Sequence, residues 1–293
     1  MKWLSVPSIS KWITGSAVWS TDKKYRHSLL REMPQHRDEF LKDMCNAVQQ
    51  AHDDARRILI EMWTDPLDPP GASSLPKPIQ NYPRCLDTDS LKGCFGEIMT
   101  AVVVRNLSPL GINDWHVPAF LFRFDDLAFD QIAEEILSGA AKKTPMPGHH
   151  GDDCLAFRRN AAGEITASLV CEAKCTADHS STMVKQAHER LSKGRPRSMG
   201  IWRVLQVLRN SNEPDSAIWA ETLTKFVLRQ PVKGYERCDL VCYVYGRPPI
   251  KTPSWIPRDK PHSSYAATRR LEVVEIGLDN VEDLVERAYG KDA

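Results

Sequence analysis

Residues 151–174 hold two short apolar runs separated by a polar turn, the pattern that predicts a β-hairpin. Successive side chains of a strand point to opposite faces, so Glu172 and Lys174 project from one face and Cys171 from the other. An acid and a lysine at the end of an apolar strand are not required for packing. Asp153 opens the preceding strand, so we expect these three charged side chains to converge at one end of the hairpin.

This trio of charges suits phosphodiester hydrolysis. The carboxylates of Asp153 and Glu172 provide the oxygen ligands that Mg²⁺ or Mn²⁺ prefers, with water and substrate phosphate completing the shell. The ammonium group of Lys174 can orient the attacking water or stabilise the charge that develops on the phosphate. Glu-X-Lys is also a common surface tripeptide, so a solvated ion pair is the alternative interpretation.

The pattern of Asp153 followed by Glu172-Ala173-Lys174 on a hairpin resembles the core of the PD-(D/E)XK nuclease superfamily. The proline that gives the family its name is absent, because Gly151 and Asp152 precede Asp153. The resemblance implies an α/β fold with a restriction-endonuclease-like core, a mixed central sheet flanked by helices.

A helix is expected from about Leu91 to Val103, because apolar residues recur there at three- and four-residue spacing. Asp89 or Ser90 can cap its amino end. In the resembled superfamily this helix often contributes an acid to the site, which makes Glu97 a candidate catalytic and metal-binding residue. Its alternative role is an ion pair on the helix surface.

Positive charge gathers after the hairpin, where residues 185–209 contain seven Lys or Arg residues and one acid. The whole chain of 293 residues has a formal net charge of only +1, so a nucleic-acid surface has to be local. The alternative is a solvated helix face followed by a loop. The candidate nucleic-acid-binding residues are Lys185, Gln186, Arg190, Lys193, Arg195 and Arg197.

The domain organisation follows the helical and proline-rich segments of the chain. We expect a largely helical N-terminal extension over residues 1–64, a proline-rich linker over 65–83 and the nuclease domain over 84–293. The sequence has no apolar run long enough to cross a membrane, no convincing signal peptide and no paired-cysteine zinc motif. We therefore expect a cytoplasmic protein with reduced thiols.

A narrower resemblance rests on Gly96-Glu97, Gly151-Asp152-Asp153 and Cys171-Glu172-Ala173-Lys174, which in this order are similar to the nuclease subunit of Hachiman-type antiphage defence, a HamA- or AbpA-like protein. It implies a DNA substrate, a superfamily 2 helicase as partner and a role as effector in defence. The alternatives are a restriction endonuclease with its own sequence specificity and a non-catalytic subunit that binds DNA or a partner. The residues do not distinguish DNA from RNA as the polymer that is cut.

Overall fold

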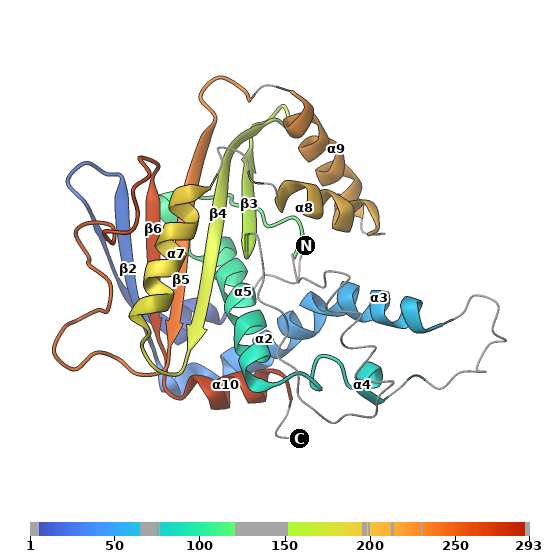
Figure 1. Cartoon of the computed structure of the whole chain (residues 1–293), viewed down its shortest axis with the longest axis horizontal. Helices are drawn as coiled ribbons and strands as arrows, with labels where there is room; N and C mark the ends of the chain where they lie inside the picture. Colours follow the sequence, from blue (N-terminus) through green and yellow to red (C-terminus); the bar gives the residue numbers. More distant parts are fainter. Residues whose placement is uncertain are drawn as a thin grey trace.

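A mixed six-stranded sheet forms the centre of the molecule (Figure 1). The computed structural model describes residues 6–64, 75, 77–120, 152–194, 198, 200–211, 214–229 and 231–290. The sheet order is β1-β2-β6-β5-β4-β3. Its strands are β1 (Ile13–Trp19), β2 (Tyr25–Glu32), β3 (Cys154–Arg159), β4 (Ile165–Thr176), β5 (Glu236–Tyr245) and β6 (Leu271–Gly277).

The sheet combines a parallel centre with an antiparallel pair at each edge. Strands β2, β6, β5 and β4 run parallel, whereas β1 pairs antiparallel with β2 and β3 pairs antiparallel with β4. The two innermost strands, β5 and β6, are buried along nearly their whole length, as expected for parallel strands covered on both faces. The expectation of an α/β protein with a mixed sheet flanked by helices is thus confirmed.

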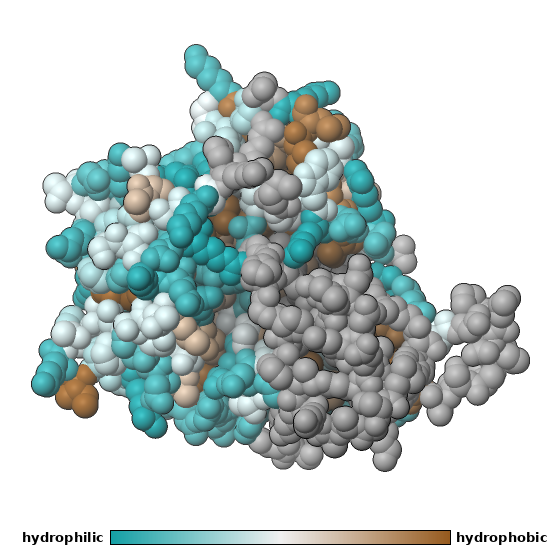
Figure 2. All heavy atoms as spheres, viewed as in Figure 1, coloured by the Kyte–Doolittle hydropathy of each residue, from teal (hydrophilic) through white to brown (hydrophobic). Residues whose placement is uncertain are grey.

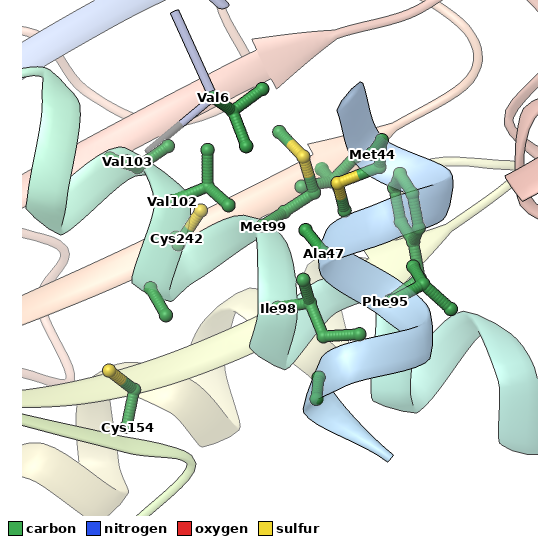
Figure 3. Close-up of a cluster of buried hydrophobic side chains, with 14 of the residues drawn as sticks. Val6, Met44, Ala47, Phe95, Ile98, Met99, Val102, Val103, Cys154 and Cys242 are labelled. Atoms are coloured by element: carbon green, nitrogen blue, oxygen red, sulfur yellow. The ribbon is translucent and has the colours of Figure 1, made fainter. Parts of the chain in front are cut away.

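One face of the sheet packs against α5 (Thr88–Asn106), α2 (Arg37–Ala51) and α10 (Val281–Ala288). Figure 3 shows Phe95, Met99 and Val102 of α5 among Met44 of α2 and Cys242 of β5. The helix α5 begins where the Asp87 carboxylate accepts a hydrogen bond from the backbone N–H of Ser90 at 2.8 Å. The helix expected from the apolar spacing is confirmed, and its cap lies two residues before the first expected position.

The opposite face carries α7 (Ser181–Lys193), α8 (Gly200–Arg209) and α9 (Pro214–Leu228). Successive side chains of β4 point to the two faces of the sheet: Cys171 packs in the core on the α5 side, and Val170 packs in the core on the α7 side. Hydrophilic residues predominate over α7 on the face shown in Figure 2, while hydrophobic residues gather over α9.

The described residues include five further helical elements. They are α1 (Ile9–Trp12), η1 (Pro34–His36), α3 (Asp53–Trp63), α4 (Lys77–Gln80) and η2 (Pro109–Gly111). None of the helices in the described part of the chain is long and apolar enough to cross a membrane.

The expectation of a separate helical extension over residues 1–64 is wrong in one respect. β1 and β2 supply two strands of the central sheet, and β2 pairs directly with β6 from the other end of the chain. Tyr25, His27 and Leu29 alternate with polar residues over only a short stretch. His27 is buried although it is a polar residue, so the sequence gives no hydrophobic pattern at this position. The largely helical interpretation of residues 1–64 therefore missed a strand whose stability comes from pairing with a distant segment.

Only part of the expected linker is described, because residues 65–74 and 76 lie outside the described ranges. The remainder does not act as a spacer. Residues 77–80 form α4, and the side chains of Ile79 and Tyr82 are buried in the same core as α5 and α2. The carboxyl-terminal part of the proline-rich segment is therefore anchored to the sheet domain.

Candidate active site

The hairpin predicted for residues 151–174 is confirmed as β3 and β4. Cys154 lies opposite Cys171, and the register continues to Arg158 opposite Ala167. The turn is closed by the Asn160 side-chain oxygen, which accepts from the backbone N–H of Glu164 at 2.9 Å. The turn lies at the far end of the hairpin from Asp153, so it leaves the open end free to carry charged side chains.

Asp153 lies one residue before β3 and is held by the backbone of β4. Its Oδ2 accepts a hydrogen bond from the Ala173 N–H at 2.7 Å, and its own N–H donates to the Cys171 carbonyl at 3.2 Å. The residue is only 5% exposed. These two contacts tie the first carboxylate to the strand segment that carries Glu172 and Lys174.

Glu172 and Lys174 share the α7 face of β4, as the two-residue spacing predicts. Lys174 Nζ donates to Glu172 Oε1 at 2.7 Å. Arg190 of α7 also reaches this oxygen, with Nη1 at 2.9 Å from Glu172 Oε1 and 3.9 Å from Asp153 Oδ1. The three expected residues are therefore gathered, and the structure adds a second cation to them.

The environment of Glu172 favours the neutral form of its carboxyl group more than solvent does. Burial raises the pKa of Glu172 to about 7, and the nearby charge of Asp153 adds to this rise. Lys174 and Arg190 act in the opposite direction. Two close carboxylates that resist simultaneous ionisation form a site that gains stability from a bound cation.

Arg190, one of the candidate nucleic-acid-binding residues, contacts the carboxylate pair. The helical pattern could have indicated this, since the buried Ala187 and Leu191 lie three residues before it and one after it, which turns Arg190 toward the edge of the sheet. The sequence did not predict that α7 packs across β4.

The other expected nucleic-acid contacts of α7 face solvent. Lys185, Gln186 and Lys193 are exposed, and Lys185 Nζ lies 3.7 Å from Glu189 Oε1. They form a polar face beside Arg190, which is consistent with a surface for phosphates but does not test it. Arg195 and Arg197 lie outside the described residues.

Glu97 lies on α5, the helix that covers the opposite face of the sheet from Glu172. Its carboxylate is near phenols: burial raises the pKa of Tyr82 and of Tyr289, and the charge of Glu97 contributes to both increases. The neighbouring Gly96 packs directly on β4, because a Cβ built there would lie 3.0 Å from Cys175 Cβ. Glu97 is therefore the residue after the point where α5 packs on β4, and its charge lies near the phenols of Tyr82 and Tyr289. It does not join the cluster of Asp153, Glu172 and Lys174 on the other face.

A divalent cation fits the donor chemistry of this cluster. Asp153 and Glu172 both present carboxylate oxygens to one cationic nitrogen, that of Arg190, so the two acids are close enough to share a positive charge. Mg²⁺ is commonly held by one or two carboxylates together with water and phosphate. Among the described residues no group of three His, Cys, Asp or Glu side chains is arranged to hold a metal ion. A metal would therefore bind Asp153 and Glu172 with solvent or substrate as its remaining ligands.

No protein-family model matches the sequence, and a search of curated proteins finds no match. The function has to be argued from the residues of the site.

Proposed function

We propose that this protein is a metal-dependent nuclease of the PD-(D/E)XK type that hydrolyses phosphodiester bonds in DNA. The observation that carries the proposal is the convergence of Asp153, Glu172 and Lys174 at the open end of the β3–β4 hairpin. These residues are 19 and 21 positions apart in the sequence, and the second carboxylate is buried beside two cations. An incidental surface ion pair has no need of such burial.

Each residue has a distinct role in the proposed reaction. Asp153 and Glu172 would hold Mg²⁺ or Mn²⁺, which supplies an acidified water and neutralises charge on the phosphate when it is bound. Lys174 would hold the attacking water or the non-bridging phosphate oxygen, because its ammonium group lies beside Glu172 and is 21% exposed. The backbone of Ala173 orients the Asp153 carboxylate. Glu97 has no role in this proposal, because it lies on α5 at the opposite face of the sheet.

The decisive experiment measures cleavage of circular and linear DNA by the purified chain with and without Mg²⁺. Glu172→Gln keeps the side-chain volume and removes the charge, so we expect cleavage to fall below detection. Glu164→Gln is the matched control, since Glu164 lies in the turn at the opposite end of the same hairpin. Cleavage that persists in both Glu172→Gln and Lys174→Ala contradicts the assignment.

The same assay separates the alternatives for the substrate. A fixed set of fragments from plasmid DNA would identify a sequence-specific restriction endonuclease, whereas a smear identifies cleavage without sequence preference. An RNA strand of the same sequence tests the sugar requirement.

One contact favours the non-catalytic alternative. Arg190 Nη1 stands 2.9 Å from Glu172 Oε1, so a protein cation already neutralises the carboxylate that would bind the metal. A non-catalytic subunit would bind DNA with an affinity that is independent of Mg²⁺ and would not cleave it. Calorimetric titration with Mn²⁺ decides between the two, because only the nuclease requires a metal site that Glu172→Gln abolishes.

The resemblance to Hachiman-type nuclease subunits supports extending the proposal to a cytoplasmic effector of antiphage defence that works with a superfamily 2 helicase. Co-expression of the chain with a superfamily 2 helicase, followed by co-purification, tests the partnership. Phage plaque assays with wild type and Glu172→Gln test the role in defence.

A further inference from the structure

A basic groove of about 840 Å³ lies at the rim of the sheet where β2, β5 and β6 begin. Arginines and lysines outnumber acids in its lining. The groove is formed by residues from the β1–β2 turn, the start of β5 and the segment before β6; its charged members are Asp22, Lys23, Lys24, Glu236, Arg237, Arg269 and Arg270.

Two guanidinium groups of the groove are fixed in place by a fully buried acid. Arg237 Nε donates to Asp239 Oδ1 and Arg269 Nε donates to Asp239 Oδ2, both at 2.9 Å. The hydroxyl of Tyr265 donates to the same Oδ2 at 2.8 Å. Arg237 is almost fully buried and its Nη2 also contacts Asp239 at 2.9 Å, so it contributes charge rather than a ligand contact. The side chains of Arg269 and Arg270 remain 22% and 28% exposed, and a guanidinium at that exposure can contact a phosphate.

The two lysines of the groove differ from these arginines. Lys23 and Lys24 are exposed in the turn between β1 and β2. With Asp239 included, five cations face three acids, which leaves an excess of two positive charges in a chain whose total net charge is +1. Positive charge is therefore concentrated here far above the average of the molecule.

The last turn of α7 connects this groove with the carboxylate cluster. Arg190 contacts Glu172, and the carbonyl of the next residue, Leu191, accepts from Arg269 Nη2 at 2.7 Å. Beyond the helix, Gly194 lies against Arg237, because a Cβ built there would lie 2.5 Å from Arg237 Nη2. Lys193, which lies between Leu191 and Gly194 in the sequence, is exposed.

The sheet register sets the distance between the two places. Glu172 pairs with Val241, and Glu236, at the groove, pairs with Ala167, five residues earlier on β4. Five residues of strand span about 17 Å. This distance corresponds to about five nucleotide steps at the ~3.4 Å rise of a B-form strand.

We propose that this groove is a second binding surface for the sugar-phosphate backbone of the nucleic acid whose scissile bond lies at Asp153 and Glu172. The inference rests on the proposed function for the position of the scissile bond, and on the groove itself for phosphate binding. Backbone contacts about five nucleotides from the cut would hold the strand in register along α7 without reading its sequence.

The test measures binding of a fluorescein-labelled 20-nucleotide single strand by fluorescence anisotropy in EDTA, where no metal-dependent cleavage occurs. The variant Lys23→Gln/Lys24→Gln removes the two exposed cations and leaves Arg237, Arg269 and Asp239 intact. Its matched control is Lys42→Gln/Lys251→Gln, which removes two exposed lysines outside the groove. Thermal unfolding of all three proteins checks that the turn between β1 and β2 still forms.

We expect the groove variant to bind about tenfold more weakly than the wild type at low salt, and the control to bind as the wild type does. The slope of log affinity against log salt should decrease by about 1.4, since each single-strand contact contributes about 0.7. Equal affinities and slopes for the groove variant and the control overturn the inference.

Parallel titrations with a duplex and with an RNA strand identify which backbone the groove prefers. The preferred ligand is the one whose affinity falls most in the groove variant. Mg²⁺-dependent cleavage is scored separately on the same preparations. An inactive wild type with a groove-dependent loss of binding rejects the nuclease and retains the groove, whereas normal cleavage with unchanged binding rejects the groove alone.

Discussion

Arg190 Nη1 lies 2.9 Å from Glu172 Oε1 and joins α7 to the strand that carries the candidate active site. The same nitrogen is 3.9 Å from Asp153 Oδ1, so the guanidinium neutralises both carboxylates in the absence of a metal. Two buried acids at this spacing would otherwise repel each other. Arg190 therefore stabilises the arrangement that a divalent cation would also stabilise, and a bound metal would compete with it for the same oxygens.

Arg190→Gln should strengthen metal binding because it removes this competing cation. We expect the dissociation constant for Mn²⁺ to decrease about tenfold, which corresponds to about 1.4 kcal/mol. Calorimetric titration of the apo protein measures it directly. Lys185→Gln, which neutralises an exposed residue of the same helix, is the control. Weaker Mn²⁺ binding in Arg190→Gln would show that the guanidinium positions the carboxylates rather than competing with the metal.

Lys174→Met should lower the rate of the chemical step while leaving DNA binding nearly intact. The ammonium group lies 2.7 Å from Glu172 Oε1. In the proposed reaction it would contact water or phosphate, so its loss would remove charge stabilisation from the transition state. We expect kcat to fall by about 10²–10³-fold with little change in KM. Single-turnover cleavage is the measurement, with Lys225→Met on α9 as the control. A change confined to KM would assign Lys174 to substrate binding only.

Gly96→Ala and Gly93→Ala should change stability in opposite directions although both lie in α5. A Cβ at Gly96 would come within 3.0 Å of Cys175 Cβ and push the helix from β4, at a cost of about 1–3 kcal/mol. A Cβ at Gly93 meets nothing within 4 Å, so alanine should stabilise the helix by about 0.5–1 kcal/mol. Urea unfolding measures both. Equal effects of the two substitutions would contradict the close packing of α5 on β4.

Protonation of His52 should make the protein less stable in acid. The imidazole is fully buried between Tyr82 and Tyr289, with Nδ1 2.8 Å from the first hydroxyl and Nε2 3.2 Å from the second. Burial lowers the pKa of His52 to about 3, with a smaller contribution from the charge of Arg56. The unfolded state binds the proton first, so stability is fully present above the ordinary histidine pKa and decreases as pH falls from about 6.5 toward 3.

His52→Gln should reduce this pH dependence. One proton bound only by the unfolded state contributes a slope of about 1.4 kcal/mol per pH unit, and the variant lacks it. Urea unfolding at pH 7 and pH 5 gives the two slopes. His36→Gln, on a side chain that is 38% exposed, is the control. Parallel slopes for His52→Gln and the wild type would contradict a buried neutral imidazole.

Local patterns in the sequence determined the hairpin, the helix before it and the shared face of Glu172 and Lys174. These follow from short-range rules: alternation along a strand, three- and four-residue spacing along a helix, and polar residues in a turn. The convergence of Asp153 on the same end also follows, because the turn at residues 160–164 sets the register of the two strands.

Tertiary structure alone decided the rest. The pairing of β2 with β6 joins residues more than 240 positions apart, and no local pattern encodes such a partner. The position of α7 across β4 brought Arg190 to Glu172, and the placement of α5 on the other face turned Glu97 toward Tyr82 and Tyr289. Chain periodicity fixes which side of an element faces a core, whereas the side chains that meet across two elements depend on how those elements pack together.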